Sequence, residues 1–263
     1  MPPLLLKLLL TPLLIAIATL VQRRWGHLAG GRFIGLPLTS APLLLMLAID
    51  RGSQFAATAS VSSLAGQLCV ALFCLGYARA VARHRWPVAL AAGLACFAIA
   101  ALIQDMVGFS LLLQESIVPL GLVAVLAGWP DAPTDSVDRP TPTWELPARM
   151  LVAVVFTLLV TESAPLLGSR LAGLVAALPV FTGLLVVFVH NEAGPASATA
   201  MVRGVVLSTF SASAFFLTVA TSLSDFGVMP AFLLALSVAA AAHLAVGTVA
   251  ASSGRPIALW RPR

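Results

Sequence analysis

The chain has 263 residues, of which 60% are hydrophobic and only 10% are charged. A soluble globular domain carries about 25% charged residues, so this composition excludes that class and indicates an integral membrane protein. The formal charge of +5 is scattered over short connections between apolar runs. Nucleic-acid-binding proteins gather their basic residues on one face, so we expect no nucleic-acid partner.

Apolar runs of membrane-spanning length follow one another along the chain, separated by charged or turn-forming residues. We expect nine transmembrane helices, over residues 3–21, 28–49, 54–78, 87–104, 106–128, 146–164, 168–189, 195–221 and 226–251. The predicted fold class is therefore an all-α, polytopic integral membrane protein. Residues 129–145, rich in proline and aspartate, form the one clearly hydrophilic linker of this prediction.

The first apolar run is predicted to be a span and not a cleaved signal peptide, because no basic segment precedes it and Lys7 lies inside it. Lys and Arg are concentrated at the connections after the first, third, fifth and seventh spans and at the C-terminus. Ten of these basic residues fall on that side of the membrane, and three fall on the other side. This bias predicts an inner (plasma) membrane protein with its N-terminus outside and its C-terminus in the cytoplasm.

The two halves of the chain resemble each other at an offset of 142 residues. The shift places Pro37 on Pro179 and Gly52 on Gly194, without a gap. Charged residues recur at the same offset, namely Lys7 with Arg149 and Asp50 with Glu192. Chance similarity between apolar segments is the alternative explanation. We predict a four-helix repeat in residues 1–105, a connecting helix and cytoplasmic linker in 106–145, and a second four-helix repeat in 146–263.

Equivalent helices in this arrangement are five spans apart, so each crosses the bilayer in the direction opposite to its counterpart. The predicted helix at 106–128 has no counterpart and makes the inversion possible. Inverted repeats are the construction of many secondary transporters, in which a central site opens first to one side of the membrane and then to the other.

Pro37 and Pro179 interrupt the second and seventh predicted spans. Each proline removes a backbone donor and disturbs the preceding turn, and hydrocarbon cannot satisfy the carbonyl groups that are freed. The hydroxyls of Thr39, Ser40 and Thr182 follow the prolines and could bond these groups or face a ligand. A simple proline kink in each helix is the alternative. Recurrence in both halves favours a binding site at the broken helices.

Small residues recur at every fourth position on the third and eighth predicted spans, a spacing that lets helix backbones approach closely. They are Thr58, Ser62 and Gly66 in one span and Ala200, Gly204 and Ser208 in the other. We expect these faces to pack against neighbouring helices. The long polar side chains of Gln67 and Arg203 lie within the same spans and need partners.

Ionisable residues at membrane depth are functional candidates, because each costs about 2.5–3.5 kcal/mol on insertion scales. Glu115, Glu162 and His243 are the candidate proton-coupling residues, and Glu115 comes first because it lies deepest in its predicted span. Arg203 could attract an anionic group of a substrate. Two structural alternatives stay open: an ion pair of Glu115 with Arg203 that only holds helices together, and a Glu162 side chain that reaches the water interface.

An enzymatic function is not expected. The four histidines lack metal-ligand spacing, the three cysteines lie inside apolar runs, and no cysteine pair follows His190 and Glu192 to complete a zinc site. No nucleophile, nucleotide or dinucleotide motif occurs. We therefore expect no catalytic residue, no metal and no cofactor.

A four-helix unit that is doubled in inverted orientation resembles the drug/metabolite transporter superfamily, in which the small multidrug exporters are the single-unit form. The stretches "GLPLTSAP" (35–42) and "ALPVFTGL" (177–184) are also similar to small four-span membrane proteins of the GlpM type. The resemblance implies two inverted helical units around a central site, and export of a small organic compound.

These observations predict a secondary membrane transporter, more specifically an exporter of a small organic metabolite, with proton coupling left open. The predicted substrate-binding residues are Pro37, Thr39, Ser40, Gln67, Pro179, Thr182 and Arg203. The expected partners are a small-molecule or lipid-like substrate and membrane lipids, and the protein is expected to be a monomer or a weak homodimer. The alternatives are a lipid flippase or scramblase, whose groove would open to the bilayer, and a non-transporting accessory protein with a closed, dry interior.

Overall fold

The computed structural model describes residues 2–38, 40–108, 110–131, 147–152, 154–155 and 179–252. These residues form helices joined by short turns, with no strand among them, which confirms the predicted all-α class. Four of these helices are long and apolar enough to cross a membrane, over Ser53–Val81, Trp86–Met106, Val180–Phe226 and Val228–Thr248. The count of nine spans stays a prediction, because residues 156–178, which include parts of two predicted spans, lie outside the described part of the chain.

The second predicted span is two short helices and not one. After α1 (Pro2–Trp25) the chain forms α2 (His27–Ile34), leaves helical geometry over residues 35–38, and continues as α3 (Ser40–Arg51). Pro37 lies in this interruption, because proline cannot donate to a helix and disfavours helical backbone in the residue before it. At about 1.5 Å per residue, α2 and α3 together measure about 30 Å, the thickness of the hydrocarbon core. Together the two helices therefore have the length of one membrane crossing, with the break between them.

Three longer helices follow in the first half of the chain: α4 (Ser53–Val81), α5 (Trp86–Val107) and α6 (Leu111–Ala127). The sequence predicts the boundary between the last two near residue 105. In the structure, α6 begins later, because Ser110 is its N-cap and its hydroxyl accepts a hydrogen bond from Leu113 N at 3.3 Å. Because α6 starts at Leu111 and not near residue 106, each residue in its first turns lies fewer positions from the helix start than the sequence indicates.

In the second half, α9 (Val180–Phe226) consists of two helices joined at Gly194, and α10 (Val228–Ser252) follows directly. Gly194 has φ 82°, a left-handed conformation that favours glycine, and Pro195 starts the second part of α9. Gly52, between α3 and α4, adopts a similar conformation at φ 91°. Each glycine thus ends a shorter helix and lets the chain turn into a longer one.

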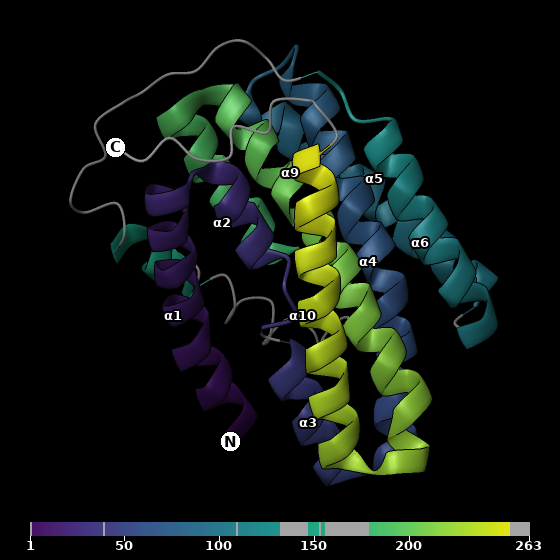
Figure 1. The fold of residues 1–263 in the computed structure, drawn as a ribbon. Helices are drawn as coiled ribbons and strands as arrows, with labels where there is room; N and C mark the ends of the chain where they lie inside the picture. Colours follow the sequence, from purple (N-terminus) through teal and green to yellow (C-terminus); the bar gives the residue numbers. More distant parts are fainter. Residues whose placement is uncertain are drawn as a thin grey trace.

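Figure 1 shows α4 and α9 together in the middle of the bundle, with α5, α6 and α10 around them. The fully buried aromatic side chains belong to these two central helices and to α5; the largest are Phe73, Tyr77, Phe97, Phe215 and Phe216. Large apolar side chains on the outer helices instead face outward, and Met106, Leu112, Leu120 and Leu244 are at least 70% exposed. An apolar exterior around buried hydroxyls and amides suits a lipid environment.

α2 crosses the second part of α9 with their backbones in close approach. A Cβ added at Gly31 would overlap the carbonyl oxygen of Met201, and one added at Gly204 would overlap the backbone of α2. One turn further along α9, Ser208 donates a hydrogen bond to the backbone oxygen of Arg32. The packing expected for the small-residue face of this helix is therefore present.

The matching face of α4 differs from this expectation. Thr58 and Ser62 are exposed, and a Cβ at Gly66 would meet no atom within 4 Å. At the offset of 142 residues, the counterpart of α2 is residues 169–176, which lie outside the described part of the chain. Of the small residues that the sequence singles out, Gly204 and Ser208 on α9 lie at a close crossing, whereas Thr58, Ser62 and Gly66 on α4 do not.

We expect Gly31→Ala and Gly204→Ala each to destabilise the protein by about 1–3 kcal/mol, because the added methyl group would push the backbones of α2 and α9 apart. Thermal unfolding in detergent measures the effect. Gly66→Ala is the matched control, since its site is open and alanine favours a helix interior over glycine. Equal stability losses in all three variants would contradict the close crossing.

Candidate functional site

A cavity of about 140 Å³ lies where the break between α2 and α3 faces the start of α9 and the middle of α4. One water molecule needs about 10–15 Å³ of such space, so the cavity holds several. Its lining consists of Ile34, Gly35, Leu36, Pro37, Ser40, Gln67, Val70, Pro179, Val180, Phe181, Thr182, Val205, Thr209 and Ala212.

The two prolines build this cavity in the same way. The carbonyl oxygen of Pro37 accepts a hydrogen bond from Ala41 N at 2.9 Å, and that of Pro179 accepts one from Gly183 N at 2.7 Å. Each proline therefore stands where a helix starts, a position at which its missing N–H costs no helical hydrogen bond. The carbonyl groups that a proline frees belong to the turn before it. Before Pro37, Phe33 O accepts a hydrogen bond from Leu36 N at 3.3 Å, whereas the turn before Pro179 lies outside the described residues.

Four polar side chains belong to the lining: Ser40, Gln67, Thr182 and Thr209. Thr209 Oγ1 and Gln67 Nε2 each donate to a backbone oxygen of their own helix, at 2.6 and 3.3 Å. Thr182 is only 5% exposed, yet neither its hydroxyl nor that of Ser40 bonds another described residue. The described lining carries no charged side chain, so the cavity is polar and uncharged.

Eight lining residues form four pairs at the offset of 142 residues. The pairs are Pro37 with Pro179, Ser40 with Thr182, Gln67 with Thr209, and Val70 with Ala212. The members of each pair are alike in chemistry: two prolines, two hydroxyls, two polar side chains and two small apolar ones. Sequence reasoning missed Thr209, although the offset applied to Gln67 would have found it.

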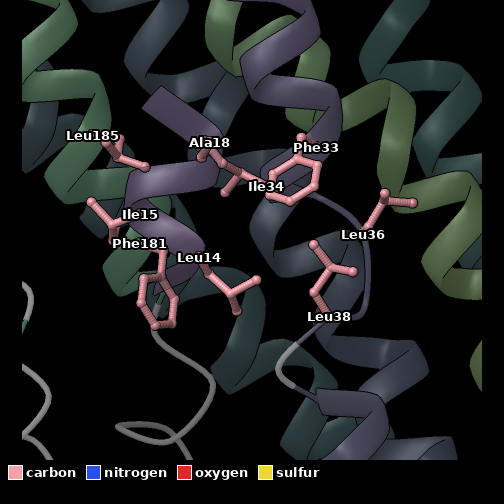
Figure 2. Close-up of a pocket in the computed structure, with 9 residues that line it drawn as sticks. All are labelled: Leu14, Ile15, Ala18, Phe33, Ile34, Leu36, Leu38, Phe181 and Leu185. Carbon is pink, nitrogen blue, oxygen red and sulfur yellow. The ribbon is translucent and has the colours of Figure 1, made fainter. Parts of the chain in front are cut away.

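A smaller apolar pocket of about 40 Å³ adjoins the cavity, between α1, the break after α2 and the start of α9 (Figure 2). Its lining comes from Leu14, Ile15, Ala18, Phe33, Ile34, Leu36, Leu38, Phe181 and Leu185. Ile34, Leu36 and Phe181 line both spaces. A polar cavity and an apolar pocket therefore share one wall.

Most of the predicted substrate-binding residues meet in this region. Pro37, Ser40, Gln67, Pro179 and Thr182 all line the cavity, whereas Thr39 lies outside the described residues. Arg203 is half-buried on α9, takes part in other interactions and does not belong to the lining. Substrate binding by any of these residues stays a prediction.

Glu115 does not have the depth that the sequence indicates. α6 begins at Leu111, so Glu115 lies in the second turn of the helix, and its side chain is exposed. The buried neighbour is Gln114, whose Nε2 donates to Gln104 Oε1 at 2.9 Å and to Gly108 O at 3.2 Å. Glu115 does not belong to the cavity lining, and its proton-coupling role stays a prediction.

Of the other two candidates for proton coupling, one lies outside the described residues and one does not belong to the cavity lining. Glu162 lies outside the described residues. His243 is half-buried on α10, and its backbone oxygen accepts a hydrogen bond from Arg32 Nη2 at 2.9 Å. Arg32, which the sequence does not single out, thereby connects the end of α2 to α10.

A buried ion pair is the clearest feature that sequence reasoning missed. Arg149 is 0% exposed, and its Nη2 forms an ion pair with Glu192, near the end of the first part of α9. Its Nη1 donates to Thr19 Oγ1 on α1 at 3.4 Å, and its guanidinium lies 5.1 Å from the ring centre of Phe188. By sequence alone, Arg149 is only an orientation signal. The structure makes it a link between α1, α9 and the segment at 147–152.

Another polar contact joins the two central helices. The hydroxyl of Tyr77 on α4 lies 3.1 Å from Nδ1 of His190 on α9. The described residues hold no group of three or more His, Cys, Asp or Glu side chains that could bind a metal ion.

Comparison of the chain with protein families, curated proteins and solved structures gives no match. Its function is therefore inferred from the cavity and the residues around it.

We expect removal of either partner of the Arg149–Glu192 pair to cost more stability than removal of both. Glu192→Gln takes the counter-charge from a fully buried guanidinium, and Arg149→Met takes it from a carboxylate that is 17% exposed. Each change should destabilise the protein by about 3–5 kcal/mol. Thermal unfolding of the single variants and of the double variant tests this. A double variant whose loss equals the sum of the single losses would contradict the coupling.

Proposed function

We propose that the protein is a secondary membrane transporter for a small organic metabolite, with its substrate site in the cavity at the broken helices. The observation that carries the proposal is the paired lining, to which both halves of the chain contribute equivalent residues. Secondary transporters place their sites between two repeats, because an exchange of conformation between the repeats opens the site to alternate sides.

Two further features support an inverted repeat in this chain. Gly52 and Gly194, separated by 142 residues, both have a positive φ and both connect a short helix to a longer one. In Figure 1, α4 and the part of α9 after Gly194 run in opposite directions, as do α5 and α10. We therefore pair α3 with the first part of α9, α4 with the second part, and α5 with α10.

The polar cavity also favours transport over the accessory-protein alternative. Non-helical backbone at membrane depth is tolerated where it borders protein or a water-filled cavity, and residues 35–37 border this one. An accessory protein would have a closed, dry interior. Space for several water molecules beside two hydroxyls without partners among the described residues argues for a ligand site instead.

A lipid flippase or scramblase is less well supported. An acyl chain extends over half of the roughly 30 Å hydrocarbon core, and the apolar pocket of about 40 Å³ is too small for it. Export as the direction of transport, coupling to protons and kinship with the drug/metabolite transporter superfamily stay predictions.

The inverted repeat predicts that equivalent turns lie on opposite sides of the membrane. Gln54, after the Gly52 turn, and Ala196, after the Gly194 turn, are equivalent positions. With Cys96 replaced by alanine, we expect an impermeant maleimide to label Gln54→Cys from outside and Ala196→Cys from the cytoplasmic side. The buried Cys69 and Cys74 should not react. Labelling of both introduced cysteines from the same side would contradict the inversion.

Transport is tested by flux of a metabolite panel in proteoliposomes, with and without an imposed pH gradient. For any solute that moves, we expect Gln67→Leu to lower the flux about 10-fold, because the cavity loses a hydrogen-bonding amide worth about 1.4 kcal/mol or more. Gln54→Leu is the matched control, since Gln54 is an exposed glutamine of the same helix.

Two results would count against this function. One is an absence of flux above protein-free liposomes for the whole panel. The other is equal flux in the wild type and in Gln67→Leu, which would place the transport path elsewhere in the protein.

A further inference from the structure

We propose that the cavity binds a small organic monocarboxylate, with its carboxylate at the starts of α3 and α9 and its apolar end in the adjoining pocket. The inference deepens the proposed transport function and rests on it, although binding can be measured separately from flux. Because no described lining side chain carries a charge, any preference for a charged ligand must come from the backbone and the hydroxyls.

Two helices start at the wall of the cavity. In α9, Gly183 N is the first amide to reach a carbonyl of the same helix, that of Pro179. The N–H groups of residues 180–182 therefore have no acceptor within the helix, and no side chain caps them. The start of α3 differs, because Leu38 N donates to Leu36 O at 2.8 Å and Ala41 N donates to Pro37 O at 2.9 Å, so that Ser40 N is the one described amide there without an acceptor. N–H groups at a helix start attract anions.

The end of α2 also borders the cavity, and carbonyl groups at a helix end would repel an anion. Most of these carbonyl groups are already bonded within the protein. The oxygens of Gly31, Arg32 and Phe33 accept hydrogen bonds from Gly35 N, Ser208 Oγ and Leu36 N, respectively. The end of α2 therefore opposes an anion less than a helix end with free carbonyl groups would.

The start of α9 favours a single negative charge. A helix N-terminus is equivalent to about half an elementary positive charge, so it does not balance a dianion. A cation would meet a positive helix end with no acidic side chain in the described lining to offset it.

Thr182 is an independent sign of a ligand. It is 5% exposed and lines the cavity, and its hydroxyl bonds no other described residue. Buried hydroxyls almost always have a partner. A carboxylate oxygen at the start of α9 would accept this hydrogen bond, and Ser40, the equivalent residue at the start of α3, offers a second donor.

The apolar pocket accounts for the other end of the ligand. Leu36 and Phe181 line both the cavity and the pocket, and the rest of the pocket wall is apolar (Figure 2). Its volume of about 40 Å³ suits the tip of a branched alkyl group or the edge of an aromatic ring. A carboxylate with such a group would bury its apolar surface there, which favours binding over that of acetate.

The test uses the full-length protein in proteoliposomes at neutral pH and five probes. Benzoate and isovalerate carry one carboxylate and an apolar end, benzamide and isovaleramide are their neutral counterparts, and benzylamine carries a positive charge. Binding is measured by calorimetry and flux by counterflow, with protein-free liposomes as background. We expect each carboxylate to bind at least 10-fold more tightly than its amide, and benzylamine not to bind.

Substitutions at two threonines of α9, one in the cavity lining and one exposed, test whether the carboxylate binds in the cavity. Thr182→Val removes the hydroxyl with little change in shape and should weaken benzoate binding about 10-fold. Thr182→Ser keeps a hydroxyl and should restore most of the affinity. Thr221→Val is the matched control, because Thr221 is exposed on the same helix and its hydroxyl bonds Leu217 O at 3.0 Å.

The outcomes separate the two proposals. Flux of a neutral or cationic solute that depends on Gln67, with no preference for carboxylates, would keep the transport function and overturn the monocarboxylate site. Carboxylate binding that requires the Thr182 hydroxyl, without flux of any solute, would keep the site and overturn transport. Equal binding by acids and amides, no binding of either carboxylate, or equal affinities in Thr182→Val and Thr221→Val would each overturn this inference.

Discussion

Backbone groups at membrane depth need hydrogen-bond partners that lipid does not supply. In this chain the requirement applies to the non-helical residues after α2, whose backbone groups must be bonded by protein or water. Pro37 and Pro179 each stand at a helix start, so their missing donors cost nothing and their carbonyl groups are bonded. The first amide groups of α9 have no acceptor within the helix, and their residues line a cavity with room for several water molecules. The cavity is thus a direct consequence of where the prolines allow the helices to begin.

The position of that break relative to the second half depends on close packing. The glycines Gly31 and Gly204 let α2 approach α9 until their backbones touch, and this contact brings the residues after α2 against Val205 and Thr209. Elsewhere, the buried Arg149–Glu192 pair connects the first part of α9 to neighbouring segments.

Several features of the site could be predicted from the sequence. The recurring prolines and the hydroxyls after them identify Pro37, Ser40, Pro179 and Thr182 of the cavity lining, because proline restricts the backbone wherever it stands. Gln67 is identified as a long polar side chain within a predicted span. The sequence places Glu115 too deep, because an apolar run does not show that Ser110 caps α6 and delays its start. The structural role of Arg149 could not be predicted, because a charge near a predicted span end indicates only orientation until its partner is known.

By itself, the sequence determined that the chain is helical and apolar enough for a membrane, and that prolines interrupt its apolar runs at residues 37 and 179. Only the tertiary structure decided which of the polar residues meet. The physical reason is that helices surrounded by lipid and by one another are apolar on every side, so hydrophobic periodicity does not indicate which face turns inward. The rotation of each helix is set by contacts such as the glycine crossing of α2 and α9, and these contacts bring Thr182 and Thr209 to the cavity while leaving Arg203 outside its lining.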